Sequence, residues 1–349
     1  MEYKLPDQPT SATPSTAEIS VDLFLGQYSS PAGSRPFLPR ETAGTPAAGN
    51  SQTELPMECR EIERLALSDP AKALVRADEY LNTRSLALLS HYCPSLRERD
   101  LCPRVGMVWL DARERSDPPS HSAPYQMFVG EDSVSLTGPD KAMVIALVKC
   151  HSNLPVIWLS YWQPEYFSAT RVPTYAFPEL SFFKLTIALN QNQSLPNALL
   201  CVAGEEKLGY LRQIVSERRL LLSAVVLGTA QAIFNYVFEY SRKRVTFGKA
   251  ICHHQAVALK LADVATDLYS ARLLCHEAYS LHREPQEFFE CTQNVWEYIN
   301  KMALKSAVTA TQLMGGHGFL QLHPVQQWLC GIQFLRQYGE MAERFVEEQ

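Results

Sequence analysis

The chain has no surplus of basic residues. Its 349 residues include 32 Lys and Arg against 37 Asp and Glu, which gives a formal net charge of −5. Proteins that bind nucleic acid gain much of their affinity from positive side chains that neutralise phosphates. We therefore expect no nucleic-acid partner. The hydrophobic content of 46% is that of an ordinary globular protein.

Several metal and cofactor motifs are also missing. The nine cysteines include no C-x-x-C pair, which argues against a zinc site or a disulfide framework and favours reduced thiols. A di-iron site in a helical bundle needs two E-x-x-H motifs, and the sequence has none. G-x-G-x-x-G loops, P-loops and the serine hydrolase elbow are absent as well. We therefore expect no metal site.

The first residues lack the apolar core of a signal peptide. The acidic residues Glu2, Asp7, Glu18 and Asp22 also argue against a transit peptide, because such peptides are rich in arginine and poor in acids. Together with the scattered cysteines, these features predict a cytoplasmic protein.

One long apolar run, Leu220–Phe238, raises the question of a membrane span. Polar side chains at Ser223, Thr229, Gln231 and Asn235 interrupt the run, and it lies within a bundle-like helical pattern. We therefore predict a helix buried in a protein core, with no membrane span.

Hydrophobic periodicity divides the chain into four parts. Residues 1–56 are rich in Pro, Ser, Thr, Ala and Gly, which predicts a disordered, low-complexity tail. Residues 57–102 have a helical period and predict a reduced N-terminal helical region. Residues 103–205 alternate with the two-residue period of strands and predict a middle β domain.

The fourth part, residues 206–349, returns to the helical period. Breaks at Gly248, Pro285 and Gly315-Gly316 are typical of helix ends. They predict a C-terminal four-helix bundle, with helices at roughly 211–243, 251–283, 287–314 and 322–347.

Two motifs lie at breaks of this bundle. The first is Arg244-Val-Thr-Phe247-Gly248-Lys249 followed by Gln255, and the second is Gln312-Leu-Met-Gly315-Gly316-His317-Gly318-Phe319. Together they resemble the C-terminal helical domain of the acyl-CoA dehydrogenase family of flavoproteins, and the resemblance is specific over about residues 206–338. It implies an α+β fold with truncated N-terminal helices, a middle antiparallel β domain and the C-terminal four-helix bundle.

The resemblance also implies FAD as the cofactor. In the family FAD lies at a subunit interface, where the neighbouring subunit's bundle holds its diphosphate and adenosine. A guanidinium suits a diphosphate because it offers charge and paired donors, and glycines let backbone N–H groups approach a phosphate. The cofactor-binding residues implied here are Arg244, Phe247, Gln255, Gln312, Gly315 and Gly316. Arg219 is implied as a substrate-binding residue.

The family's catalytic base does not carry over. Many members use a Glu in a Tyr-Glu-Gly-Thr segment, and the matching position here is Gly339, which has no side chain to accept a proton. Glu340 follows it, but one helical step turns a side chain by about 100°, so Glu340 could serve only after a shift of register. Other members place the base earlier, at the position of Arg218, beside Glu217. No catalytic residue is therefore assigned.

The middle domain has diverged too. Leu110–Asp117 keeps only the end of the family's Thr-Glu-Pro-Gly-Ala-Gly-Ser-Asp-like flavin loop, and Ala142–Ile145 replaces the aromatic-Ile-Thr that covers the flavin ring. The contacts that a subunit makes to its own flavin are mostly gone, whereas those that it lends to a neighbour remain. This asymmetry predicts a homo- or hetero-oligomer in which the chain contributes half an FAD site to an acyl-CoA dehydrogenase-like partner chain.

The expected function is that of an acyl-CoA dehydrogenase-like flavoprotein. Such a protein would be an FAD-dependent oxidoreductase, or a subunit of one, that acts on CH–CH groups of an acyl thioester or a related small molecule. Two alternatives stay open. One is a non-catalytic scaffold, or pseudoenzyme, of the same fold. The other is a flavin-dependent monooxygenase, which shares the fold and does not need the Glu base.

Overall fold

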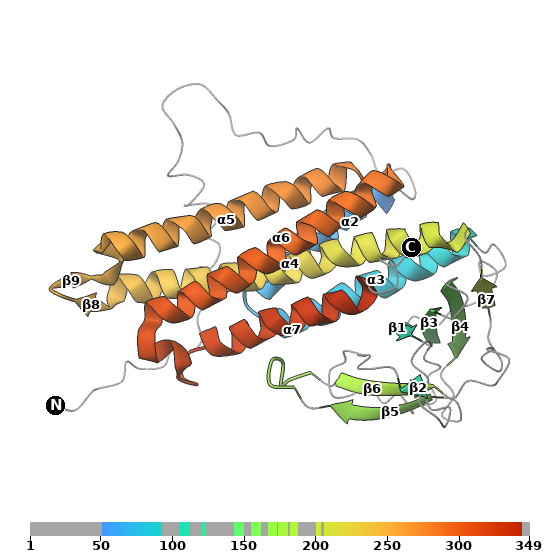
Figure 1. Ribbon diagram of the computed structural model, residues 1–349, viewed down its shortest axis with the longest axis horizontal. Helices are drawn as coiled ribbons and strands as arrows, with labels where there is room; N and C mark the ends of the chain where they lie inside the picture. The colour runs from blue at the N-terminus through green and yellow to red at the C-terminus, as the bar shows by residue number, and fades with distance from the viewer. Residues whose placement is uncertain are drawn as a thin grey trace, which may run out of the picture. The chain divides into compact units, whose positions relative to one another are not determined.

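A computed structural model gives the fold of the chain (Figure 1). Side chains are described within residues 55–88, 174–180 and 209–340. The backbone is described for residues 51–92, 105–111, 121–122, 143–149, 155–161, 167–172, 174–180, 182–187, 200–203 and 206–343. The predicted tail therefore lies almost entirely outside the described residues.

The described residues of the N-terminal region form two helices, α2 (Ser51–Ala66) and α3 (Pro70–Tyr92). Helix α2 begins at Ser51, within the last residues of the segment expected as a tail. Asp69 caps α3, since its Oδ1 accepts the backbone N–H of Lys72 at 3.0 Å, and Pro70 occupies the first helical position. The connection between the two helices is therefore short and specified by sequence.

The strands that the structure describes in the middle region form two sheets. The first is four-stranded, in the order β1 (Val105–Asp111), β3 (Met143–Lys149), β4 (Pro155–Tyr161) and β7 (Leu200–Ala203). The second is three-stranded, in the order β2 (His121–Ser122), β6 (Phe182–Ile187) and β5 (Phe167–Val172). The strands pair antiparallel, as expected, except that β1 and β3 pair parallel. The further strands expected at 125–129 and 134–136 lie outside the described residues.

The C-terminal region contains the four long helices that the sequence predicts. They are α4 (Glu206–Lys243), α5 (Gln255–Ser280), α6 (Pro285–Met314) and α7 (Val325–Glu343). Short elements connect them: the hairpin β8 (Val245–Thr246) and β9 (Lys249–Ala250), then the 3-10 helices η2 (Ile251–His253) and η3 (Gly315–Phe319). Pro285 begins α6 and Gly315 ends it, which are the positions where these residue types are favoured.

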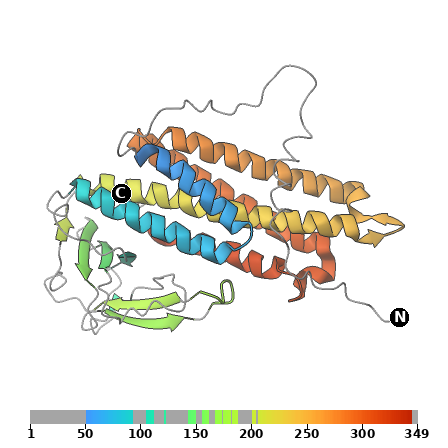
Figure 2. The ribbon, with the colours of Figure 1, turned by 180° about the vertical axis from the view of Figure 1, so that it is seen from behind.

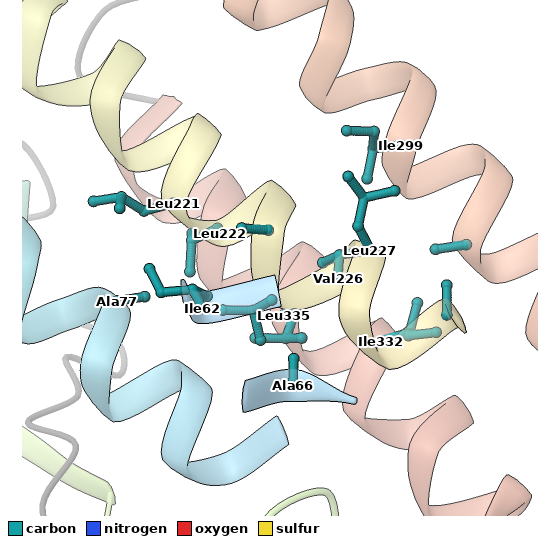
Figure 3. Packing of buried hydrophobic residues seen from close by; sticks show 14 of the residues in the cluster. Ile62, Ala66, Ala77, Leu221, Leu222, Val226, Leu227, Ile299, Ile332 and Leu335 are labelled. Atoms are coloured by element: carbon teal, nitrogen blue, oxygen red, sulfur yellow. The ribbon is translucent and has the colours of Figure 1, made fainter. Parts of the chain in front are cut away.

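Helix α4 lies at the centre of the hydrophobic core. Seen from behind, α2 (blue) and α3 (cyan) lie against α4 (yellow) (Figure 2). The close view in Figure 3 shows buried residues of α2, α3, α6 and α7 packed around α4, namely Ile62, Ala66, Ala77, Leu221, Leu222, Val226, Leu227, Ile299, Ile332 and Leu335. Figure 3 therefore places the N-terminal helices and the C-terminal bundle in one continuous core.

The apolar sequence of α4 is explained by its burial in this core. Gly209–Lys243 is the one described helix that is long and apolar enough to cross a membrane, and 78% of its most apolar window is buried inside the protein. A core helix of a soluble protein can be equally long and equally apolar. The packing of α4 therefore supports the predicted core helix.

Gly228 allows α2 to approach α4 closely. A Cβ atom at this position would overlap the Glu63 carbonyl oxygen and would also press on the Ala66 Cβ. Because the obstruction includes backbone, we expect Gly228→Ala to lower the free energy of unfolding by about 1–3 kcal/mol. Urea denaturation measures this change. Gly209→Ala, at an exposed site in the first turns of α4, is the control and is expected to cost nothing. Equal midpoints for the two variants would contradict the expectation.

Candidate functional site

The first motif forms an exposed hairpin after α4. The Arg244 N–H donates to the Tyr240 carbonyl at 2.9 Å, and the Arg244 carbonyl accepts the Ile251 N–H at 2.8 Å, so the base of the hairpin is fixed. At its tip Phe247 has φ 50° and Gly248 has φ 77°. Left-handed backbone at a non-glycine residue costs on the order of 1–3 kcal/mol and is concentrated at ligand-binding sites.

The side chain of Phe247 is 98% exposed. An isolated hydrophobic residue on a surface needs no explanation, but a fully exposed phenyl ring on a strained turn is unusual. The guanidinium of Arg244 lies at the foot of the same hairpin and is also exposed. Both residues can therefore contact a bound molecule without any rearrangement of the core.

The two glutamines come from neighbouring helices. Gln255 is the first residue of α5 and Gln312 lies near the end of α6, and both are exposed. The Gln312 Oε1 accepts a hydrogen bond from the Lys260 Nζ at 3.4 Å, which links α6 to α5. Lys260 lies five residues after Gln255 on α5, so the contact joins Gln312 to the helix that begins at Gln255.

The glycines of the second motif have distinct roles. Gly315 has φ 59°, which a side chain rarely tolerates, and its N–H donates to the Gln312 carbonyl. Open space surrounds the Cβ positions of Gly315 and Gly316, so a ligand can approach the backbone there. Gly318 instead packs on α6, because a Cβ there would lie 2.6 Å from the Thr311 carbonyl oxygen.

The elements that carry the predicted cofactor-binding residues lie at one end of the bundle (Figure 1). The hairpin after α4, the start of α5 and the end of α6 meet there. Tyr236, Tyr240 and His323, which the sequence did not single out, form a group of rings with His317 of the glycine motif at the same end. A second histidine six residues after the glycine-motif histidine was the one available signal, whereas tyrosines four residues apart on a helix indicate only a shared face.

Arg219 lies elsewhere, inside the core. It is 2% exposed, its Nη1 donates to the Phe289 carbonyl at 2.9 Å, and its guanidinium lies 4.4 Å from the centroid of the Phe289 ring. The described contacts of Arg219 are thus with α6. Substrate binding by Arg219 stays a prediction, and it would require a pocket to open beside α6.

The two positions of the family's base are adjacent in space. The Arg218 Nη1 donates to the Gly339 carbonyl at 3.1 Å, and its Nη2 donates to the Tyr338 carbonyl at 2.8 Å. The Trp296 ring lies against Gly339, and a Cβ there would be 2.8 Å from Cε2 and 2.9 Å from Cη2 of the ring. A side chain at residue 339 would therefore overlap the indole, which is itself only 4% exposed.

Asp78 completes this group. Its Oδ2 accepts the Tyr338 hydroxyl at 2.7 Å, and the Tyr338 ring lies 4.5 Å from the Arg218 guanidinium. Burial raises the pKa of Asp78 to about 6, although the Tyr338 hydrogen bond and the Arg218 charge oppose the shift. We call Asp78, Arg218, Trp296, Tyr338 and Gly339 the Arg218 cluster.

The neighbouring carboxylates have structural partners. Glu340 forms an exposed pair with Arg336 at 2.9 Å on the next turn of α7. Glu217 is 1% exposed and accepts hydrogen bonds from Arg84 at 2.7 Å and His282 at 3.2 Å. Burial alone would raise the pKa of Glu217, but these partners outweigh it and the pKa lies below its ordinary value.

Comparisons with known proteins match the C-terminal helical domain and the fold. The family model described as the acyl-CoA dehydrogenase C-terminal domain matches residues 208–339. An acyl-CoA dehydrogenase of Bacillus subtilis is 32% identical over 111 residues, which are 32% of this chain and 29% of the relative. Butyryl-CoA dehydrogenase from Megasphaera elsdenii has a TM-score of 0.61 at 18% identity, covering 82% of this chain and 80% of that chain. PigA with FAD and proline has a TM-score of 0.65 at 14% identity, with coverages of 82% and 80%.

The sequence likeness and the structural likeness differ in extent. The matched stretch spans about a third of the length of the curated relatives, whereas the shared fold extends over most of the chain. Both likenesses include the helical bundle that carries the two motifs. The comparisons therefore agree on an acyl-CoA dehydrogenase-like family, and the clearest match is the C-terminal helical domain at residues 208–339.

Proposed function

We propose that the chain is a flavoprotein subunit that holds part of an FAD molecule whose remaining contacts come from an acyl-CoA dehydrogenase-like partner chain. Its substrate class is an acyl thioester or a related small molecule, and the proton acceptor for the reaction belongs to the partner. The chain's own contribution is the end of the bundle that carries Arg244, Phe247, Gln255 and Gln312.

One contrast carries this proposal. At the Arg218 cluster, an arginine holds one base position and an indole excludes any side chain from the other. At the end of the bundle, by comparison, the side chains of Arg244, Phe247, Gln255 and Gln312 are exposed. The proton-transfer position is thus closed, while the cofactor-facing surface is intact.

The exposed residues suit FAD by their chemistry. The Phe247 ring offers a flat apolar face, the Arg244 guanidinium can pair with a diphosphate, and the Gly315-Gly316 backbone has space around it for phosphate oxygens. When bound, FAD would supply the hydride acceptor. The residues of this chain would orient the dinucleotide and leave proton transfer to others.

The flavin content of purified protein tests the proposal. We expect the chain to be colourless alone and yellow when co-purified with a sister chain that carries the Tyr-Glu-Gly-Thr segment. Yellow protein that consumes oxygen with reduced flavin, without a partner, would favour the monooxygenase. Colourless protein in every preparation would favour the non-catalytic scaffold.

Substitution of two cofactor-facing residues gives a sharper result. We expect Arg244→Ala combined with Gln312→Ala to weaken FAD retention by the complex at least tenfold, because hydrogen bonds to charged groups contribute about 1.5–3 kcal/mol each. Equilibrium dialysis followed by visible absorbance measures the retained flavin. Arg242→Ala combined with Gln333→Ala removes the same residue types from other exposed positions and is expected to retain FAD. Unchanged retention in the first variant would refute the proposed half-site.

A further inference from the structure

Two imidazole rings stack beside the glycine turn. His317 belongs to η3 and His323 lies in the loop before α7. Their ring centroids are 5.7 Å apart, and the ring planes differ by 17°. Both side chains are half-buried. The two rings are therefore held side by side, within a few residues of Gly315-Gly316.

Two tyrosines on α4 fix the orientation of these rings. The Tyr240 hydroxyl lies 3.0 Å from the His317 Nδ1, and the Tyr236 hydroxyl lies 2.6 Å from the His323 Nδ1. Because Tyr236 and Tyr240 are one helical turn apart, they present their hydroxyls from one face of α4. When a tyrosine hydroxyl donates to Nδ1, the imidazole carries its proton on Nε2. Both rings then offer an Nε2–H donor on the side away from their tyrosine.

The Nε2 atoms are available to a ligand. Within the described part of the chain, neither Nε2 atom has a hydrogen-bond partner. Neither atom is among the buried side-chain atoms that lack a partner. Two donors on rings 5.7 Å apart can reach separate oxygens of one phosphate group at ordinary lengths of about 2.7–3.2 Å. The start of α7 at Val325 adds the positive end of a helix dipole directly after His323.

A shared metal ion has too few ligands here. Zinc sites take at least three protein ligands, so a pair of imidazoles alone would leave a zinc ion short of them. Across the described ranges, no group of three or more His, Cys, Asp or Glu residues is placed to hold a metal. The donor pair therefore suits an anion better than a cation.

We infer that His317 and His323 bind a phosphate group through their Nε2–H donors, with Tyr236 and Tyr240 as positioning residues that set the tautomer. The inference rests on the proposed function, because the dinucleotide's diphosphate is the phosphate expected at this end of the bundle. A free phosphate has the same chemistry, so the experiment must separate the two sources.

Imidazole NMR of the complex with the partner chain, stripped of its flavin, provides the first test, with inorganic pyrophosphate, inorganic phosphate and FAD as probes. We expect the Hε1 and Nε2 resonances of His317 and His323 to shift on addition of pyrophosphate and FAD, while those of the exposed His276 on α5 stay in place. Shifts with inorganic phosphate but not with FAD would assign the pair to free phosphate and overturn the link to the dinucleotide. No shift with any probe would overturn the phosphate site.

Variants of the complex provide the second test. We expect His317→Gln and His323→Gln each to weaken FAD retention about tenfold, and His276→Gln to leave it unchanged. Tyr240→Phe should change the ¹⁵N tautomer signature of His317 without unfolding the chain, which a merely structural role would not predict. If the Arg244 and Gln312 variants lose flavin while the histidine variants keep it, the phosphate inference fails and the half-site stands. If none of them loses flavin, the half-site itself fails.

Discussion

Gly339→Glu, which restores the family's residue at its base position, is expected to destabilise the protein without creating a catalytic base. The new side chain would overlap the Trp296 ring, which already lies within van der Waals contact of the glycine. Overpacking of this kind costs about 1–3 kcal/mol, and a buried carboxylate adds to it, so we expect a loss of about 3 kcal/mol or more. The free energy of unfolding in urea measures this loss.

Two further variants separate sterics from charge. Gly339→Ala keeps only the overlap with the indole and should cost about 1–3 kcal/mol. Trp296→Gly itself removes a buried ring and is expected to cost about 3–5 kcal/mol. Because the two residues are in contact, the double variant Gly339→Glu with Trp296→Gly should lose less stability than the sum of the two single losses. If Gly339→Glu folds as stably as the natural chain, or if the two single losses add in full, the indole does not close the base position.

Arg84→Ala is expected to be the second large effect, since it breaks a buried ion pair that joins the N-terminal helices to the bundle. Arg84 on α3 donates to Glu217 on α4 at 2.7 Å and to Glu58 on α2 at 3.1 Å. Glu217 is 1% exposed, so removal of the guanidinium leaves a buried carboxylate with less compensation. Breaking such a pair typically costs about 3–5 kcal/mol.

The control and the pH dependence identify the cause. Arg76→Ala removes an exposed arginine from the same helix, which pairs with Glu61 and Glu79, and should cost at most about 1 kcal/mol. In the natural chain the pKa of Glu217 is lowered, so its contribution to stability is present above about pH 4.5 and is lost as the pH falls through its folded pKa. Without Arg84, burial should raise that pKa. The variant should then gain stability from pH 7 to pH 5, and a pH-independent loss would contradict the buried-charge explanation.

The helical bundle could be predicted from the sequence because its signals are local. Pro285 and Gly315 bound α6 at the positions where these residues start and stop helices, and the apolar period fixes the buried faces. The start of α2 was less visible. Its first residues read as a polar tail, but Leu55 is buried on the face that it shares with Cys59 and Ile62. Tertiary packing therefore extends this helix beyond its local signal.

Strand pairing and the closed base position depend on contacts that no local pattern contains. Alternation predicts a strand but not the direction of its partner, so the parallel pairing of β1 with β3 could not be foreseen. The absence of a side chain at the position that matches the family's base was readable from Gly339 itself. The reason that the position cannot be refilled was not, because it depends on how α6 and α7 pack and bring Trp296 onto this glycine.

The exposed phenyl groups of the bundle end have a consequence for how the chain exists in a cell. Phe247 is 98% exposed and Phe319 is 69% exposed. Each Å² of such apolar surface that a cofactor or a neighbouring protein covers stabilises the complex by about 25 cal/mol. The free chain lacks this stabilisation, because the same surface faces water. A chain synthesised in excess of its partner chain would therefore expose an aggregation-prone apolar surface at this end of the bundle. Synthesis of the two chains in equal amounts would protect its solubility.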